Sequence, residues 1–259
     1  MTSLHALPDL LVFPIVAIPF LLAVVCAPYI RRGVWPGWSA KTDGSEVMDA
    51  FIALASATAV VLTLSLVNVE GALRQVEERA AHEAAVLDDL DRSLVRYGDP
   101  RAPAVRMQLK RYGEAIVAME WPLLHEGQRS TGADAIYGDI GKGLAQIEPD
   151  SHRQQLVYAE ALRQFDELSD LRDQRVEAAN VQLPAIYWLA TLGMASLMIL
   201  IAALNRPTIE RSIMTGAIAG AIGLLVALVV IFDAPFEGSG SVTPAPFERV
   251  LQLIAARQG

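Results

Sequence analysis

The stretch AFIALASATAVVLTLSLVNV, residues 50–69, decides the fold, because about 20 consecutive positions carry no charged side chain. At about 1.5 Å of rise per residue, a helix of this length spans the hydrocarbon core of a bilayer, which is about 30 Å thick. Three further runs lack charge in the same way: residues 10–30, 178–205 and 212–232. Backbone groups in lipid must be hydrogen-bonded within the segment, so the four runs predict transmembrane helices rather than strands.

The composition agrees with a membrane protein. Of the 259 residues, 53% are hydrophobic and only 19% are charged, which is too few charges for an ordinary soluble domain. The net charge of -8 argues against a surface that binds nucleic acid. The single cysteine, Cys26, excludes an internal disulfide framework and a cysteine-based metal site. Pro14, Pro19 and Pro28 predict that the first span is the least regular of the four.

The region between the second and third spans is polar and predicts a bundle of helices. From Leu73 onward, apolar residues recur every three or four positions, which predicts an amphipathic helix that continues the second span and ends at Gly98-Asp99-Pro100. Its expected apolar face consists of Val76, Ala80, Leu87, Leu90, Leu94 and Tyr97. A second helix should run to Trp121-Pro122, with Val105, Leu109, Tyr112, Ile116 and Met119 on its apolar face.

Two more helices complete the predicted bundle. A third covers roughly residues 133–147, and a fourth, capped by Asp150 or Ser151, leads into the third span near Pro184. The expected apolar face of the fourth consists of Leu156, Tyr158, Leu162, Phe165, Leu168 and Val176. The predicted fold class is therefore an all-α integral membrane protein, with four transmembrane helices and a helical-bundle stalk inserted between helices 2 and 3.

The expected domain division follows from these segments. Transmembrane helices 1 and 2 occupy residues 1–70, the extramembrane stalk 71–182, transmembrane helices 3 and 4 183–235, and a C-terminal tail with a short helix 236–259. The short loops carry Arg31, Arg32, Lys41, Arg206 and Arg211. Because basic residues mark cytoplasmic loops, the stalk and both termini are expected on the extracytoplasmic side. Helix lengths place Trp121 within about 10 Å of the lipid surface.

Glu83 falls on the apolar seam of the first stalk helix, and a buried carboxylate needs a partner. Two interpretations stay open: an ion pair inside the stalk with an arginine such as Arg106 or Arg163, or a role in ion passage. Glu120, beside Trp121-Pro122 at a helix end, is in the same way either a structural anchor or an ion ligand.

Asp233 ends the fourth span, and Pro235 cannot continue the helix. The Asp233 carboxylate is expected either to cap the turn that follows or to form part of a charged ring at a pore mouth.

Small residues recur at helical spacing within the spans. The fourth span contains Gly216-xxx-Gly220 and Ala219-xxx-Gly223, and the second contains Ala55-xxx-Ala59. Such spacings let two helix backbones approach closely, either within one protomer or between copies.

No motif for catalysis, metal binding or a cofactor is evident. His82-Glu83 lacks a second histidine four residues after His82, and His125-Glu126 is equally isolated. An enzyme is therefore disfavoured, because catalytic groups need a converging constellation, and no cofactor is expected.

Several of these segments together resemble a known family. They are LDRSLVRYG (90–98), EWP (120–122), Leu183-Pro184, residues 202–207, FDAPFEG (232–238) and PAPF (244–247). The pattern resembles the bestrophin-like domain family of bacterial and plant membrane proteins, a family of unassigned function, over roughly residues 45–253. In this chain only Asp233 remains of the Glu-Leu-Asp that precedes the Pro-Phe of the family's usual closing pattern. The resemblance implies structural roles for Glu83, Glu120, Trp121, Pro122, Asp233, Pro235 and Phe236.

The resemblance also implies a function, because true bestrophins are homopentameric ion channels whose second membrane helix lines the pore. By this analogy, the pathway candidates lie in and around the second span: Glu46, Asp49, Ser56, Thr63, Asn68 and Glu70. Two interpretations of the acidic residues stay open: at both mouths of an oligomeric pore they would attract cations, or they are ordinary interfacial charges that keep the helix in register. The resemblance implies a bacterial-type inner membrane and a pentamer, although bestrophins place their helical middle in the cytosol, opposite to the loop charges here. The alternative is a non-conducting scaffold or envelope sensor that binds a partner through its stalk.

Overall fold

The computed structural model describes residues 9–34, 44–124, 128–179, 183–233, 236 and 241–258. The described residues are helical with short connections and contain no strand. They form two compact units. The first contains the described residues up to Ala72 and those between Gln182 and Ser241, and the second contains those of Leu73–Val181 and Val242–Gly259. Lys41, His125-Glu126 and Pro235 lie outside the described residues.

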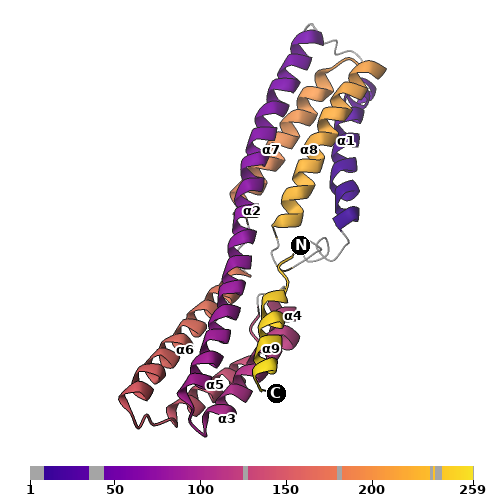
Figure 1. Cartoon of the computed structure of the whole chain (residues 1–259). Coiled ribbons are helices and arrows are strands. Elements are labelled where there is room, and N and C mark those ends of the chain that lie inside the picture. Colours follow the sequence, from indigo (N-terminus) through magenta and orange to yellow (C-terminus); the bar gives the residue numbers. More distant parts are fainter. Residues whose placement is uncertain are drawn as a thin grey trace. The chain divides into compact units, whose positions relative to one another are not determined.

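The first unit contains the membrane helices (Figure 1). These are α1 (Asp9–Val34), the Gly44–Ala72 part of α2 (Gly44–Tyr97), α7 (Ala185–Leu204) and α8 (Ile209–Phe232). Each of the four is long and apolar enough to cross a membrane, which confirms the predicted spans. α1 continues through its three prolines.

Close packing in the first unit depends on small residues of α8. Gly223 faces Ala17 of α1 so closely that an added Cβ would lie 2.7 Å from the Ala17 Cα. Gly216 and Gly220 face Val25 and Leu21 of the same helix. The small-residue spacing in α8 is therefore used within one protomer. The buried core beside this contact consists of Val24, Phe51, Ala55, Leu62, Met198, Ala202, Ala219 and Ile222.

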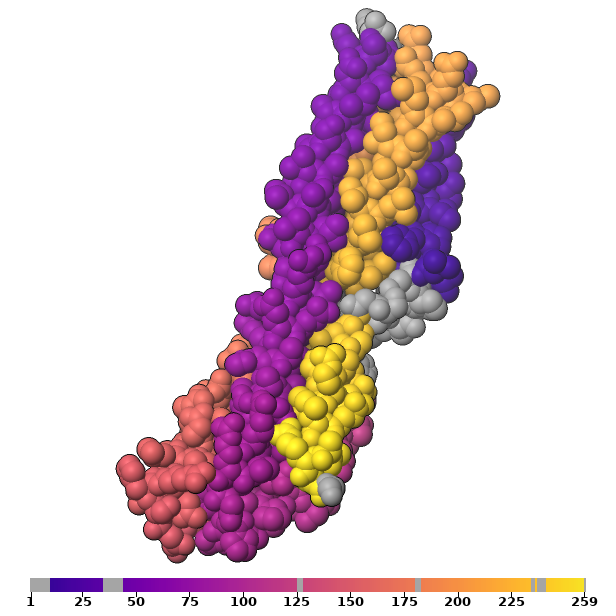
Figure 2. Space-filling view, viewed as in Figure 1, coloured from indigo at the N-terminus to yellow at the C-terminus, as the bar shows by residue number. Residues whose placement is uncertain are grey.

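The second unit contains the rest of α2 together with shorter helices. These are α3 (Ala102–Ala115), a π-helical turn (Ile116–Glu120), α4 (Trp121–Leu124), α5 (Thr131–Ala145), α6 (His152–Ala178) and α9 (Ala245–Gln258). Figure 2 shows α9, in yellow, against the Leu73–Tyr97 part of α2. α9 thus belongs to the same compact unit as residues 73–181.

Local signals set the helix ends in this unit. α2 ends where Gly98 adopts a positive φ of 72°, a conformation that costs little without a Cβ. α6 begins with a capping box in which Ser151 accepts from the Gln154 N–H and the Gln154 side chain accepts from the Ser151 N–H. The cap is therefore Ser151 rather than Asp150.

The predicted apolar face of the Leu73–Tyr97 part of α2 is confirmed, because all six of its residues are buried. The predicted face of α6 is partly wrong. Leu168 and Val176 are buried as predicted, but Leu156 and Leu162 are exposed. The other buried residues of α6 include Ala161, Gln164, Arg172 and Arg175. The buried face of α6 includes two arginines. A prediction from apolar residues alone therefore placed the face incorrectly.

The expected continuity of the fourth stalk helix with the third span is also wrong. α6 ends at Ala178 and α7 begins at Ala185, with Pro184 directly before it. Proline disfavours helical geometry at the residue that precedes it, so a new helix begins here.

Candidate functional site

Polar side chains follow one face of α2 in the first unit. Asp49, Ser56, Thr63 and Glu70 are spaced by seven residues, which is nearly two helical turns. The first three are exposed, and Glu70 is partly exposed. Between them, Ala53, Val60 and Val67 complete an alternating spacing of three and four, and all three are exposed. We call this face the α2 stripe. It combines a polar ladder with the spacing by which helices associate side by side.

The hydroxyl groups of the α2 stripe are oriented by their own helix. Ser56 Oγ donates to the Ile52 carbonyl at 2.9 Å, and Thr63 Oγ1 donates to the Ala59 carbonyl at 2.7 Å. Because each proton is committed to the backbone, each oxygen offers only lone pairs to its surroundings. An array of acceptors of this kind suits a cation rather than an anion.

Two other pathway candidates lie next to the stripe. Glu46 and Asn68 are exposed on α2, whereas Thr58 and Ser65 on the opposite side are buried. The buried pair donate to the Leu54 and Val61 carbonyls.

A buried ionic cluster occupies the second unit. It consists of Glu83 on α2, Glu120 at the end of the π-helical turn, and Arg172 and Arg175 on α6. Arg175 Nε lies 2.6 Å from Glu83 Oε2, and Arg175 Nη2 lies 2.7 Å from Glu120 Oε1. Arg172 Nη2 lies 2.5 Å from Glu120 Oε2. Glu83, Glu120 and Arg175 have no exposed surface.

The surroundings shift the pKa values of these groups in opposite directions. Burial raises the pKa of Glu83 and outweighs the attraction of Arg175. Burial also acts to raise the pKa of Glu120, but its hydrogen bond to Arg172 and the charges of both arginines outweigh it, so the pKa is lowered. Two guanidinium groups on one carboxylate therefore keep Glu120 ionised.

The π-helical turn explains why Glu120 points inward. Along α3, Val105, Leu109, Tyr112 and Ile116 are buried, and the spacing predicts Met119 as the next buried residue. The wider turn delays the face by one position, so Met119 is 45% exposed and Glu120 is fully buried. The expectation for Met119 is therefore wrong. Pro122 lacks an N–H and its ring clashes with a regular α-helical turn, which favours the widening just before it.

The partner predicted for Glu83 is corrected by this geometry. Glu83 forms an ion pair, but with Arg175. Arg106 pairs instead with Asp91 at 2.7 Å, and Arg163 lies on the surface with Glu160 and Glu167.

The side chains of Trp121 and Asp233 each form a hydrogen bond with a backbone group. Trp121 Nε1 donates to the Val242 carbonyl at 3.2 Å, and its ring meets Phe247 edge-on at 5.9 Å between centroids. The Asp233 carboxylate accepts from the Leu183 N–H at 2.7 Å and so fastens the residues just before α7. Phe236 is partly buried and Pro122 is exposed.

Arg172, Arg175 and Asp91 are the residues that the sequence reasoning missed. Arg172 and Arg175 continue the three-and-four spacing of Phe165 and Leu168. They therefore occupy core positions of the helix, where the pattern predicts apolar residues. Asp91 is fully buried, and pairs with Arg106 and, at 3.1 Å, with Arg257 of α9.

Among the residues that the structure describes, no three histidine, cysteine or acidic side chains gather as a metal site.

Comparisons with solved structures identify the fold. The chain is similar to a bacterial bestrophin homologue from Klebsiella pneumoniae, with a TM-score of 0.71, 16% identity, and coverage of 93% of this chain and 98% of that chain. A variant of that homologue with a tryptophan changed to alanine gives a TM-score of 0.68, 17% identity, and coverage of 94% and 97%. At these identities the likeness shows the fold. No curated protein matches the chain by sequence.

Sequence comparison then gives the family. The profile of the bestrophin-like domain matches residues 17–247, which include most of both units and the family motifs from residues 90–98 to 244–247. Together with the four membrane helices, this match shows an integral membrane protein with the bestrophin fold. The chain belongs to the bestrophin-like domain family.

Proposed function

We propose that the chain forms a symmetric oligomer, pentameric by its resemblance to bestrophins, that conducts ions along α2. The α2 stripe carries this proposal. Its polar residues repeat every seven positions and are exposed in the isolated chain, so copies of α2 arranged around an axis would line a pathway with them.

The chemistry of the stripe favours cations. Glu46 and Asp49 lie at one end of the membrane part of α2 and Glu70 at the other, so each mouth of an oligomeric pore would carry a ring of carboxylates. Between the mouths, Ser56 and Thr63 present acceptor oxygens. The acidic mouths and the acceptors both favour cation passage over anion passage.

The first experiment is the mass of the purified protein in detergent, followed by ion flux in liposomes. The proposal expects a pentamer with potassium flux that exceeds chloride flux. A monodisperse monomer without flux would contradict it, and would favour the non-conducting scaffold that binds a partner through its second unit.

A pair of variants tests the stripe itself. Ser56→Ala with Thr63→Val removes the two acceptor oxygens and should reduce potassium flux severalfold without changing the oligomer. Ser196→Ala is the matched control, because Ser196 is also exposed on a membrane helix and also donates to a carbonyl four residues earlier, but lies on α7. Equal flux in both proteins would rule out the α2 stripe as the pathway.

For the orientation, we propose that α3–α6 and α9 lie on the extracytoplasmic side. Arg31, Arg32, Arg206 and Arg211 lie at the ends of α1, α7 and α8, and basic loops face the cytoplasm. A Cys26→Ser protein carrying Ser151→Cys should react with a membrane-impermeant maleimide on intact cells. Labelling only after the cells are opened would reverse the orientation.

A further inference from the structure

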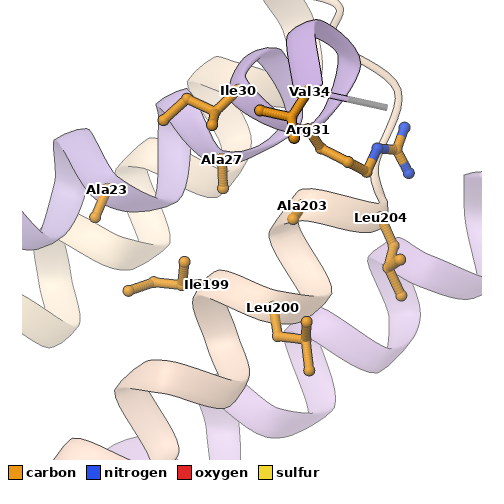
Figure 3. A pocket seen from close by; sticks show the side chains of 9 residues that line it. All are labelled: Ala23, Ala27, Ile30, Arg31, Val34, Ile199, Leu200, Ala203 and Leu204. Atoms are coloured by element: carbon orange, nitrogen blue, oxygen red, sulfur yellow. The ribbon is translucent and has the colours of Figure 1, made fainter. Parts of the chain in front are cut away.

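An apolar pocket of about 400 Å³ lies between α1 and α7 in the first unit. Its walls are formed by Ala23, Ala27 and Ile30 of α1 and by Ile199, Leu200 and Ala203 of α7 (Figure 3). Ile30 and Leu200 are mostly exposed, so the described residues leave these two apolar side chains of the pocket largely uncovered. The volume lies within the range of about 300–1,000 Å³ that ligand pockets occupy.

The length of the pocket matches one leaflet of a bilayer. From Ala23 to Val34 the α1 helix rises roughly 16 Å, and half of a hydrocarbon core is about 15 Å. Its wall is apolar except for Arg31, which lies at one end with its guanidinium turned away from the apolar side chains (Figure 3). This arrangement fits a hydrocarbon chain with a polar group at one end.

Two arginines lie at that end of the pocket. Arg31 Nη2 donates to the Asn205 carbonyl at 3.5 Å, and Arg211 Nη1 donates to the Asn205 Oδ1 at 3.2 Å. Two guanidinium groups thus converge on one asparagine, which follows the pocket residue Leu204 directly. Asn205 is 2% exposed, and its Nδ2 has no hydrogen-bond partner among the described residues. Two cations and a buried amide donor in one place are complementary to an anion that accepts hydrogen bonds.

We propose that this pocket holds one acyl chain of an anionic phospholipid, whose phosphate lies against Arg31, Asn205 and Arg211. The pocket supplies apolar contact along the chain, and the three donors select the negative head group. None of the residues that line the pocket belongs to the α2 stripe.

The test measures the lipid that the protein retains. Protein purified in mild detergent is exchanged into mixed micelles with equal phosphatidylglycerol and phosphatidylcholine, and bound lipid is counted by mass spectrometry. The wild type should retain phosphatidylglycerol preferentially. Arg31→Gln should lower this retention about fivefold, which corresponds to the loss of one arginine beside an anionic lipid. Arg32→Gln, at the neighbouring exposed arginine, is the control and should have little effect.

A second variant tests the acyl chain separately. Ala203→Phe fills the pocket and should abolish retention of both lipids, whereas Ala190→Phe at an exposed position of the same helix should not. Equal retention of the two lipids by the wild type, or retention unchanged in Ala203→Phe, would overturn the proposal. Displacement of the phosphatidylglycerol by millimolar glycerol phosphate would do the same, because it would indicate a site for free phosphate. A change of oligomer mass in Ala203→Phe without lipid loss would assign the pocket to a second copy of the chain.

Discussion

At the scale of single residues, the buried charges of the second unit depend on Arg175. Its guanidinium contacts both Glu83 and Glu120, and it lies 5.5 Å from the centroid of the Trp121 ring and 5.7 Å from that of Phe247. Without this cation, Glu83 would be a fully buried carboxylate that has lost its ion-pair partner. Removal of one partner from a buried ion pair typically costs about 3–5 kcal/mol.

We therefore expect Arg175→Met to lower the melting temperature in detergent strongly. Methionine retains an unbranched apolar side chain, so the change isolates the loss of charge. Arg163→Met on the same helix is the control, because Arg163 forms its ion pairs with Glu160 and Glu167 on the surface, where they contribute little. Similar melting curves for the two variants would show that the buried cluster is not a main source of stability.

The need for a partner of Glu83 could be predicted from its place on an apolar seam, but the partner itself could not. Arg175 lies 92 residues after Glu83 in the sequence. Which arginine pairs with Glu83 therefore depends on how α6 packs against α2. Glu120 was harder still, because its inward direction depends on one π-helical turn, and a regular helical spacing points to Met119 instead. Asp49, Ser56 and Thr63 stay predictions as pathway residues; the sequence shows only that they are polar groups in and beside an apolar span.

At the scale of helices, α8 packs closely against α1 in the first unit. Gly223 allows it, because the Ala17 backbone occupies the space that a Cβ would need. The sequence indicated a close contact for α8 from its spacing of small residues. It could not indicate the partner helix, because an apolar surface in lipid has no preferred neighbour until side-chain shapes are matched.

Gly223→Ala should push α1 and α8 apart, at a cost of about 1–3 kcal/mol for overpacking. Gly193→Ala on α7 is the matched control, because nothing lies within 4 Å of the position that its Cβ would take. Thermal unfolding of both proteins in the same detergent checks the expectation. If Gly223→Ala is as stable as the control, the contact between α1 and α8 tolerates an added methyl group and is not closely packed at Gly223.

At the scale of the whole molecule, the chain closes its second unit with residues from beyond its last membrane helix. Val242 accepts from Trp121, Phe247 is fully buried, and Arg257 pairs with Asp91 and with Asp88. A short helix over residues 247–256 could be predicted from the sequence. Its place in the second unit could not, since contacts over such separations depend on the fold of everything between them.

Trp121→Ala should release this last segment, because it removes both the hydrogen bond to Val242 and the ring contact with Phe247. We expect faster tryptic cleavage after Arg249 and Arg257 and a lower melting temperature in detergent. Trp188→Ala, on α7 of the first unit, serves as the control and should leave cleavage at these two sites unchanged. Cleavage at the wild-type rate in Trp121→Ala would show that Trp121 does not hold the segment.

The late position of α9 also affects how the protein is made. Glu83, Glu120 and Arg175 leave the ribosome well before Phe247, and two membrane helices must be inserted by the translocon in between. Until residues 242–258 follow, the Trp121 ring lacks Phe247 and Asp91 lacks Arg257. During the synthesis of α7 and α8 the second unit therefore has all four residues of its buried ionic cluster but lacks its contacts with α9. We expect a chain truncated before α9 to be degraded faster than the full chain.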